Sequence, residues 1–122
     1  MPQTAPPGWP ATVPPPDSPG WQRAAVEWLL DQCPADYRGY AGWRRHPIAL
    51  AWVATRHVDA QLQAMRQAYR DCRAELYEQL PPRAMTEVLA NLEAEGLRLR
   101  AAARSAAMIH EALEGKRYAP RL

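Results

Sequence analysis

The chain has 122 residues, of which 48% are hydrophobic and 23% are charged, with a formal net charge of +2. This composition excludes a chain that is disordered throughout, and the small net charge excludes a strong field that would concentrate nucleic acid. No run of about 18 apolar residues is present, so we expect no membrane contact. The two cysteines, Cys33 and Cys72, and a start without the pattern of a secretory signal favour a cytoplasmic location.

Residues 1–17 are rich in proline, which removes backbone donors and favours an extended polyproline II conformation. We therefore predict a disordered N-terminal tail that does not pack on the rest of the chain. Trp9 is unusual for a plain linker, and the segment contains two weak PxxP matches. Two interpretations stay open for this tail: a solvated linker, or a segment that docks on a partner through Trp9.

A first helix is predicted over residues 19–33, with Ser18 as N-cap and Pro19 at the first helical position. Pro34 ends this helix at Cys33, because the residue before a proline disfavours helical backbone angles. Residues 34–46 contain two glycines and a proline and are predicted to form a loop that carries three aromatic residues.

Two long helices are predicted over residues 47–80 and 82–114, and Gly115 ends the second one. Each has apolar residues spaced alternately three and four apart, which is typical of a coiled-coil seam. The seam residues of the first long helix are Ile48, Ala51, Thr55, Val58, Leu62, Met65, Tyr69, Cys72 and Leu76. Those of the second are Met85, Leu89, Leu92, Gly96, Leu99, Ala103, Ala106, His110 and Leu113.

The predicted fold is therefore all-α. A long antiparallel, coiled-coil-like helical hairpin carries a short third helix at its open end, where Trp28 and Leu29 would cover Trp52. Residues 18–115 make up this three-helix domain, residues 1–17 the disordered proline-rich N-terminus, and residues 116–122 a basic C-terminal tail.

Candidate residues for metal binding are His57, His110 and Glu114. His110 and Glu114 share one helical face at a spacing of four, but a third ligand is missing and no known metal motif is matched. Cys72 falls on the apolar seam, and the acids near Cys33 would raise the pKa of its thiol. With no phosphate-binding loop or nucleophile motif either, we expect neither a cofactor nor an enzymatic activity.

Basic residues offer a nucleic-acid hypothesis. The candidates at the start of the first long helix and in the C-terminal tail are Arg44, Arg45, His46, Lys116 and Arg117. Arg66, Arg70 and Arg73 form a further basic stripe, in which Arg70 and Arg66 are expected to pair with Glu93 and Glu95 across the hairpin.

A second apolar stripe lies one step around each long helix from the main seam. The residues expected to form a partner or dimer surface are Ala60, Ala64, Ala68, Ala90, Ala94 and Leu97. The short third helix cannot cover this stripe along the whole hairpin, so we expect a homodimer or a different protein partner. The favoured function is a non-enzymatic helical interaction or adaptor protein. A nucleic-acid-associated regulator and a metal or small-ligand binder are the alternatives.

Overall fold

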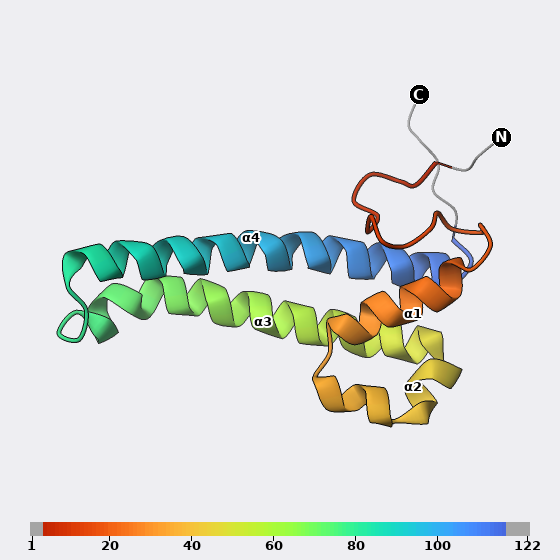
Figure 1. The fold of residues 1–122 in the computed structure, drawn as a ribbon, viewed down its shortest axis with the longest axis horizontal. Coiled ribbons are helices and arrows are strands. Elements are labelled where there is room, and N and C mark those ends of the chain that lie inside the picture. The colour runs from red at the N-terminus through yellow and green to blue at the C-terminus, as the bar shows by residue number, and fades with distance from the viewer. Residues whose placement is uncertain (1–3, 117–122) are drawn as a thin grey trace.

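The computed structural model describes residues 4–116, and every regular element in this range is a helix. In chain order these are α1 (Trp21–Asp31), the 3-10 helix η1 (Ala35–Gly39), α2 (Ala41–Arg45), α3 (Pro47–Leu76) and α4 (Pro82–Leu113). α3 and α4 lie antiparallel and side by side as a rod (Figure 1), which confirms the all-α hairpin. Their 30 and 32 residues extend about 45 Å. None of the described helices combines the length and apolar character that a membrane crossing requires.

The rod has a closed end, where residues 77–81 join α3 to α4, and an open end, where α1, η1 and α2 lie beside it (Figure 1). α3 ends at Leu76, four residues before its predicted end at Leu80. The backbone N–H groups of Gln79 and Leu80 both donate to the Leu76 carbonyl, each at 3.0 Å, and this turn ends the helix. α4 stops at Leu113. Gly115 adopts the left-handed conformation, with φ 89°, and donates its N–H to the Ala112 carbonyl at 3.0 Å.

α1 begins two residues later than the sequence suggested, and Ser18 is not its N-cap. The backbone N–H and the hydroxyl of Ser18 both donate to the Pro15 carbonyl, so Ser18 closes a turn that precedes the helix. Gly20 occupies the N-cap position with φ 78°, a left-handed conformation that glycine adopts without strain.

Residues 34–46 are not the irregular loop that their two glycines and proline predicted. They form two single-turn helices, η1 and α2, held together by aromatic packing rather than by helix propensity. The Tyr37 and Trp43 rings are parallel within 1°, and their centroids are 5.2 Å apart. The Tyr37 hydroxyl also shares a hydrogen bond of 2.7 Å with His57 Nε2, which fixes the segment to α3.

The prediction of a disordered, unpacked N-terminus does not hold for residues 4–17, which pack against α1 and the last turns of α4 (Figure 1). Trp9 is only 9% exposed, and its indole N–H donates to the Val13 and Pro14 carbonyls at 3.0 and 3.1 Å. The Ser105 hydroxyl donates to the Gly8 carbonyl at 2.6 Å. A proline-rich segment without helix or strand can therefore bury isolated apolar side chains. Its own turns provide hydrogen-bond partners for the polar atoms that burial would otherwise leave unsatisfied.

The core is concentrated at the open end, where α3 contacts α1 as well as α4. Its buried members are Trp9, Val13, Trp21, Ala25, Val26, Leu29, Leu30, Leu50, Ala51, Ala54 and Ile109. A smaller cluster of Val58, Leu62, Leu99 and Ala102 continues the core along the rod.

Contact with α1 rotates the buried face of α3, so part of the predicted seam is wrong. Leu50 and Ala54 are buried, whereas Ile48 is 47% exposed. Trp52 is 51% exposed and does not lie under Trp28 and Leu29; the Arg56 guanidinium sits 4.5 Å above its ring instead. At the closed end Leu76 is also exposed, since two helices alone bury only a narrow strip.

Candidate functional site

An open groove of about 490 Å³ runs between α3 and α4 along one side of the rod. It is lined by Leu62, Arg66, Tyr69, Arg70, Leu92, Glu93, Gly96, Leu97 and Arg100. A Cβ atom placed on Gly96 would meet nothing within 4 Å, so the lack of a side chain there leaves this part of the groove open. The groove therefore exists because α3 and α4 meet there without another of the described helices over them.

The groove combines a buried apolar floor with exposed apolar side chains. Leu62 belongs to the smaller core cluster, whereas Tyr69 is 45% and Leu97 is 61% exposed. Large apolar side chains gathered around a hollow, rather than scattered singly, mark a surface that another molecule can cover.

The charges of the groove are three arginines and one glutamate. Within residues 4–116, no ion pair joins Arg66, Arg70 or Arg100 to an acidic group. The predicted bridges from Arg66 and Arg70 to Glu93 and Glu95 are therefore wrong.

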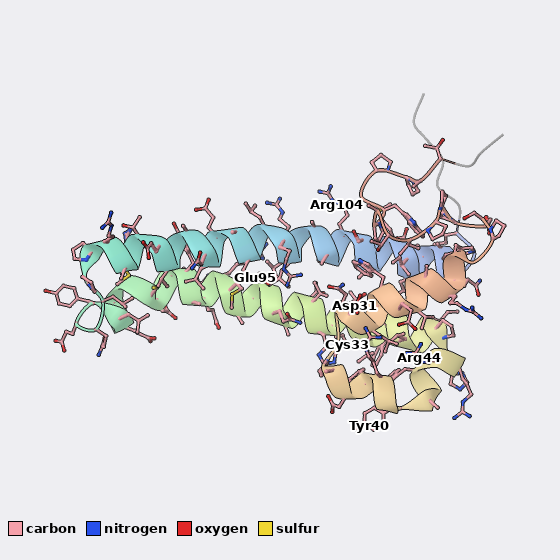
Figure 2. All side chains as sticks on the ribbon, in the orientation of Figure 1. Asp31, Cys33, Tyr40, Arg44, Glu95 and Arg104 are labelled. Atoms are coloured by element: carbon pink, nitrogen blue, oxygen red, sulfur yellow. The ribbon has the colours of Figure 1, made fainter. Side chains whose placement is uncertain are left out.

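Glu95, which Figure 2 labels, pairs within its own helix. Arg98, three residues further along α4, donates from Nε to Glu95 Oε1 at 2.9 Å. These hydrogen bonds hold the pKa of Glu95 below its ordinary value. Glu95 therefore pairs with a neighbour on its own helix, and Arg66 and Arg70 of α3 have no ion pair with it.

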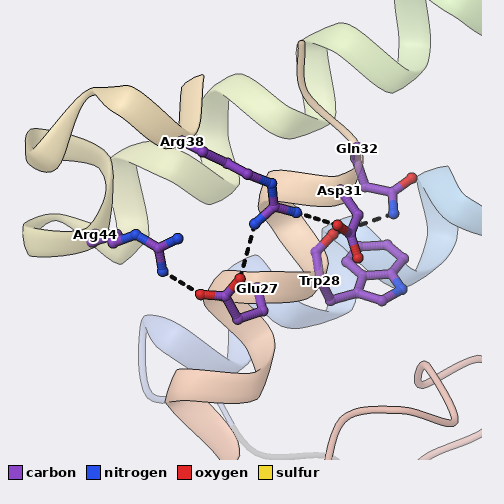
Figure 3. A network of polar contacts seen from close by, with 6 residues as sticks. All are labelled: Glu27, Trp28, Asp31, Gln32, Arg38 and Arg44. Carbon is purple, nitrogen blue, oxygen red and sulfur yellow. Dashed lines mark hydrogen bonds and ion pairs between the residues drawn. The ribbon is translucent and has the colours of Figure 1, made fainter. Parts of the chain in front are cut away.

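Of the predicted nucleic-acid residues that lie within residues 4–116, Arg44 is not part of a free basic patch. Arg44 binds Glu27 of α1, and Arg38 bridges Glu27 and Asp31 (Figure 3). These contacts lower the pKa of Glu27, with the hydrogen bond from Arg44 as the largest cause and that from Arg38 next. Arg44 thus fastens α2 to α1.

The remaining basic candidates are spread over separate segments. Arg45 and His46 are exposed at the end of α2, and Lys116 is exposed with Nζ 3.9 Å from Glu114. Arg117 lies outside the described residues.

The candidate metal ligands are not brought together. His57 is hydrogen-bonded to Tyr37, and His110 Nε2 lies 3.9 Å from Glu114 Oε1. Across residues 4–116, no group of three His, Cys, Asp or Glu side chains is placed to hold a metal ion.

The two thiols are not activated. Burial raises the pKa of the half-buried Cys33 thiol. The direction agrees with the prediction from the sequence, but the cause is desolvation and not the neighbouring acids. Cys72 is buried, with Sγ 3.6 Å from Met85 Sδ.

The six residues predicted as a partner surface are separated by the structure into two groups. Leu97 lines the groove. The alanines do not line it; Ala60, Ala64, Ala90 and Ala94 are exposed and Ala68 is half-buried. The predicted apolar stripe and the groove are therefore separate surfaces, and Leu97 is the one residue of the predicted stripe that lines the groove.

A second hollow, of about 460 Å³, lies on the short helices and is lined by Tyr37, Tyr40, Gly42, Trp43, His46 and Ala49. Tyr40 is 57% exposed at the outer edge of this segment, away from the rod (Figure 2). Sequence reasoning missed this hollow, although three aromatic residues within seven positions were a signal for it.

Comparison of the chain with protein-family models, with curated proteins and with solved structures finds no match.

Proposed function

We propose that this chain is a non-enzymatic helical interaction protein that binds a protein partner through the groove between α3 and α4. The observation that carries this proposal is the groove itself, in which exposed Tyr69 and Leu97 flank an apolar floor beside arginines without acidic partners. Tyrosine and arginine are enriched at the centres of protein interfaces, where burial of one large side chain contributes much of the affinity.

The alternatives have less support. The nucleic-acid hypothesis loses Arg44 to its ion pair with Glu27. An enzymatic role gains no support from the two described cysteines, since the pKa of the Cys33 thiol is raised and Cys72 is buried. The free thiols of both cysteines support a reducing, cytoplasmic location as part of the proposal.

We also propose a homodimer through the exposed alanines of α3 and α4, which would let two rods approach closely. Light scattering after size exclusion should then report twice the chain mass of 13.7 kDa. Ala64→Glu or Ala94→Arg should shift the mass to one chain without a change in helix content. A single-chain mass for the wild type at every concentration would contradict the dimer and leave the groove proposal intact.

The proposed function is tested by photo-crosslinking in the source cells. A benzophenone amino acid replaces Leu97 in the groove, and a matched variant carries it at Gln22, which is exposed on α1. We expect a covalent adduct with one partner protein from position 97 and none from position 22. Adducts of equal yield from both positions, or none from position 97, would contradict the assignment.

A further inference from the structure

The register of α3 against α4 determines how charge is distributed along the groove. Cys72 lies against Met85, and Leu62 and Leu99 share one core cluster. By this register Arg100 lies next to Leu62 at the end of the groove nearer the open end, and Glu93 lies opposite the middle of the α3 wall, near the level of Arg66. The groove wall as a whole carries three arginines and one glutamate, so its net charge is positive, and Arg100 lies farthest toward the open end.

The length of the groove limits what can fill it. From Leu62 to Arg70 the α3 wall extends about 12 Å, which matches roughly two turns of a bound helix. A helix in a groove is held by apolar residues three and four apart on one face, and Leu92, Leu97 and Tyr69 offer the surfaces that such residues contact.

We propose that the groove binds an amphipathic helix of another protein, whose apolar stripe fills the floor and whose acidic side chains face Arg66 and Arg100. This inference rests on the proposed function and adds the chemistry of the partner. Charge complementarity carries it: a partner with acids supplies the charges that the arginines lack within this chain. Its acids would gather toward Arg100 at the open-end side, because Glu93 repels them in the middle of the groove.

A second copy of the chain does not fit the groove. Face-to-face packing of two grooves would bring together two sets of three arginines, each with a single glutamate. Like charges placed opposite one another oppose association. Nucleic acid is also disfavoured, because phosphate contacts do not use an apolar floor and Glu93 would repel phosphate.

The test uses two synthetic, fluorescently labelled helical peptides of about 14 residues, with leucine at positions three and four apart on one face. One carries glutamates beside the leucines, and the other carries lysines at the same positions. Fluorescence anisotropy with the full chain should show the glutamate peptide binding about tenfold more tightly than the lysine peptide. A double variant, Arg66→Glu with Arg100→Glu, should reverse this order.

Three further variants sharpen the comparison. Glu93→Gln should tighten binding of the glutamate peptide, because it removes the one repulsive charge of the groove. Leu97→Ala should weaken binding of both peptides. Arg23→Glu makes the same charge reversal on an exposed site of α1 and should leave binding unchanged. The four substituted groove residues are exposed in the structure: Arg66, Glu93, Leu97 and Arg100. Circular dichroism melts check that each variant is folded.

Equal binding of both peptides, no binding of either peptide, or displacement of the glutamate peptide by random duplex DNA would each overturn the inference. Concentration-dependent dimerisation that Arg66→Glu abolishes would assign the groove to self-association and would also overturn it. If position 97 crosslinks a partner helix that lacks acids, the acidic partner is wrong while the proposed function stands. If position 97 crosslinks nothing, both fail.

Discussion

The open and closed ends of the rod are built from the same two helices and differ in what covers them. At the open end, α1 and residues 4–20 lie on the α3–α4 pair and produce a core in which Leu29, Leu50 and Ile109 are fully buried. Toward the closed end none of the segments within residues 4–116 covers the pair, and Tyr69, together with the seam residue Leu76, is exposed. The apolar pattern of both helices is continuous, so coverage by other segments decides where it becomes core.

Stability is therefore expected to depend on the open end, while binding is expected to use the uncovered part. An element that contributes little to folding can carry an exposed apolar surface without a large loss of native stability. This division explains how one periodic hairpin can hold both a core and a docking face.

The largest expected effect is at the open end. Leu50→Ala removes a fully buried side chain and should lower the free energy of unfolding by about 2–5 kcal/mol. Leu76→Ala, at a seam position that is 38% exposed, should cost less than about 1 kcal/mol. Urea denaturation followed by circular dichroism measures both, and equal losses would show that the two ends are buried alike.

The next effect concerns the N-terminal segment. Trp9→Ala should lower the free energy of unfolding by about 1–3 kcal/mol, less than a full core truncation, because residues 4–20 can detach while the helices stay folded. Thr12→Ala, at an exposed position of the same segment, is the control. A melting temperature for Trp9→Ala equal to that of the control would mean that this segment does not dock on the rod in solution.

The smallest effect is electrostatic. Arg44 and Arg38 lower the folded-state pKa of Glu27 below its ordinary value of 4.5. Because this pKa is lower in the folded state, Glu27 stabilises the fold above pH 4.5, and the contribution disappears as the pH falls through the folded-state pKa. The side chain is 47% exposed, so solvent screening limits the contribution to about 1 kcal/mol or less.

Melting curves of the wild type and Glu27→Gln between pH 7 and pH 3 measure this contribution. The two melting temperatures should differ slightly at neutral pH and converge in acid. A gap that widens as the pH falls would have the wrong sign for this ion pair.

Much of the hairpin follows from local sequence signals. Pro47 and Pro82 sit in the first turn of α3 and α4, where a missing N–H has no cost, and the spacing of apolar residues gives the seam between them. The register that follows from the closing turn also places Leu62 beside Arg100, and both line the groove.

The remaining features depend on contacts between distant residues. Ser105 and Gly8 are 97 positions apart, and no periodic pattern in a proline-rich segment indicates that it docks on α4. An uncovered part of the rod was predicted from the shortness of the first helix, but its lining was predicted as alanines, whereas the groove is lined by Tyr69, Leu97 and three arginines among others. The pairing of Arg66 and Arg70 was predicted from register alone, which ignores that Arg98 engages Glu95 on its own helix.

We expect the uncovered part of the rod to bind an acidic helix and the open end not to bind it. Methyl NMR of the full chain with labelled leucines tests it most directly, by titration with the glutamate peptide. Shifts should be confined to Leu62, Leu92 and Leu97, which line the groove, and should leave Leu29, Leu30 and Leu50 of the open-end core unmoved. Shifts in the open-end leucines alone, or no shifts under saturating peptide, would contradict the account.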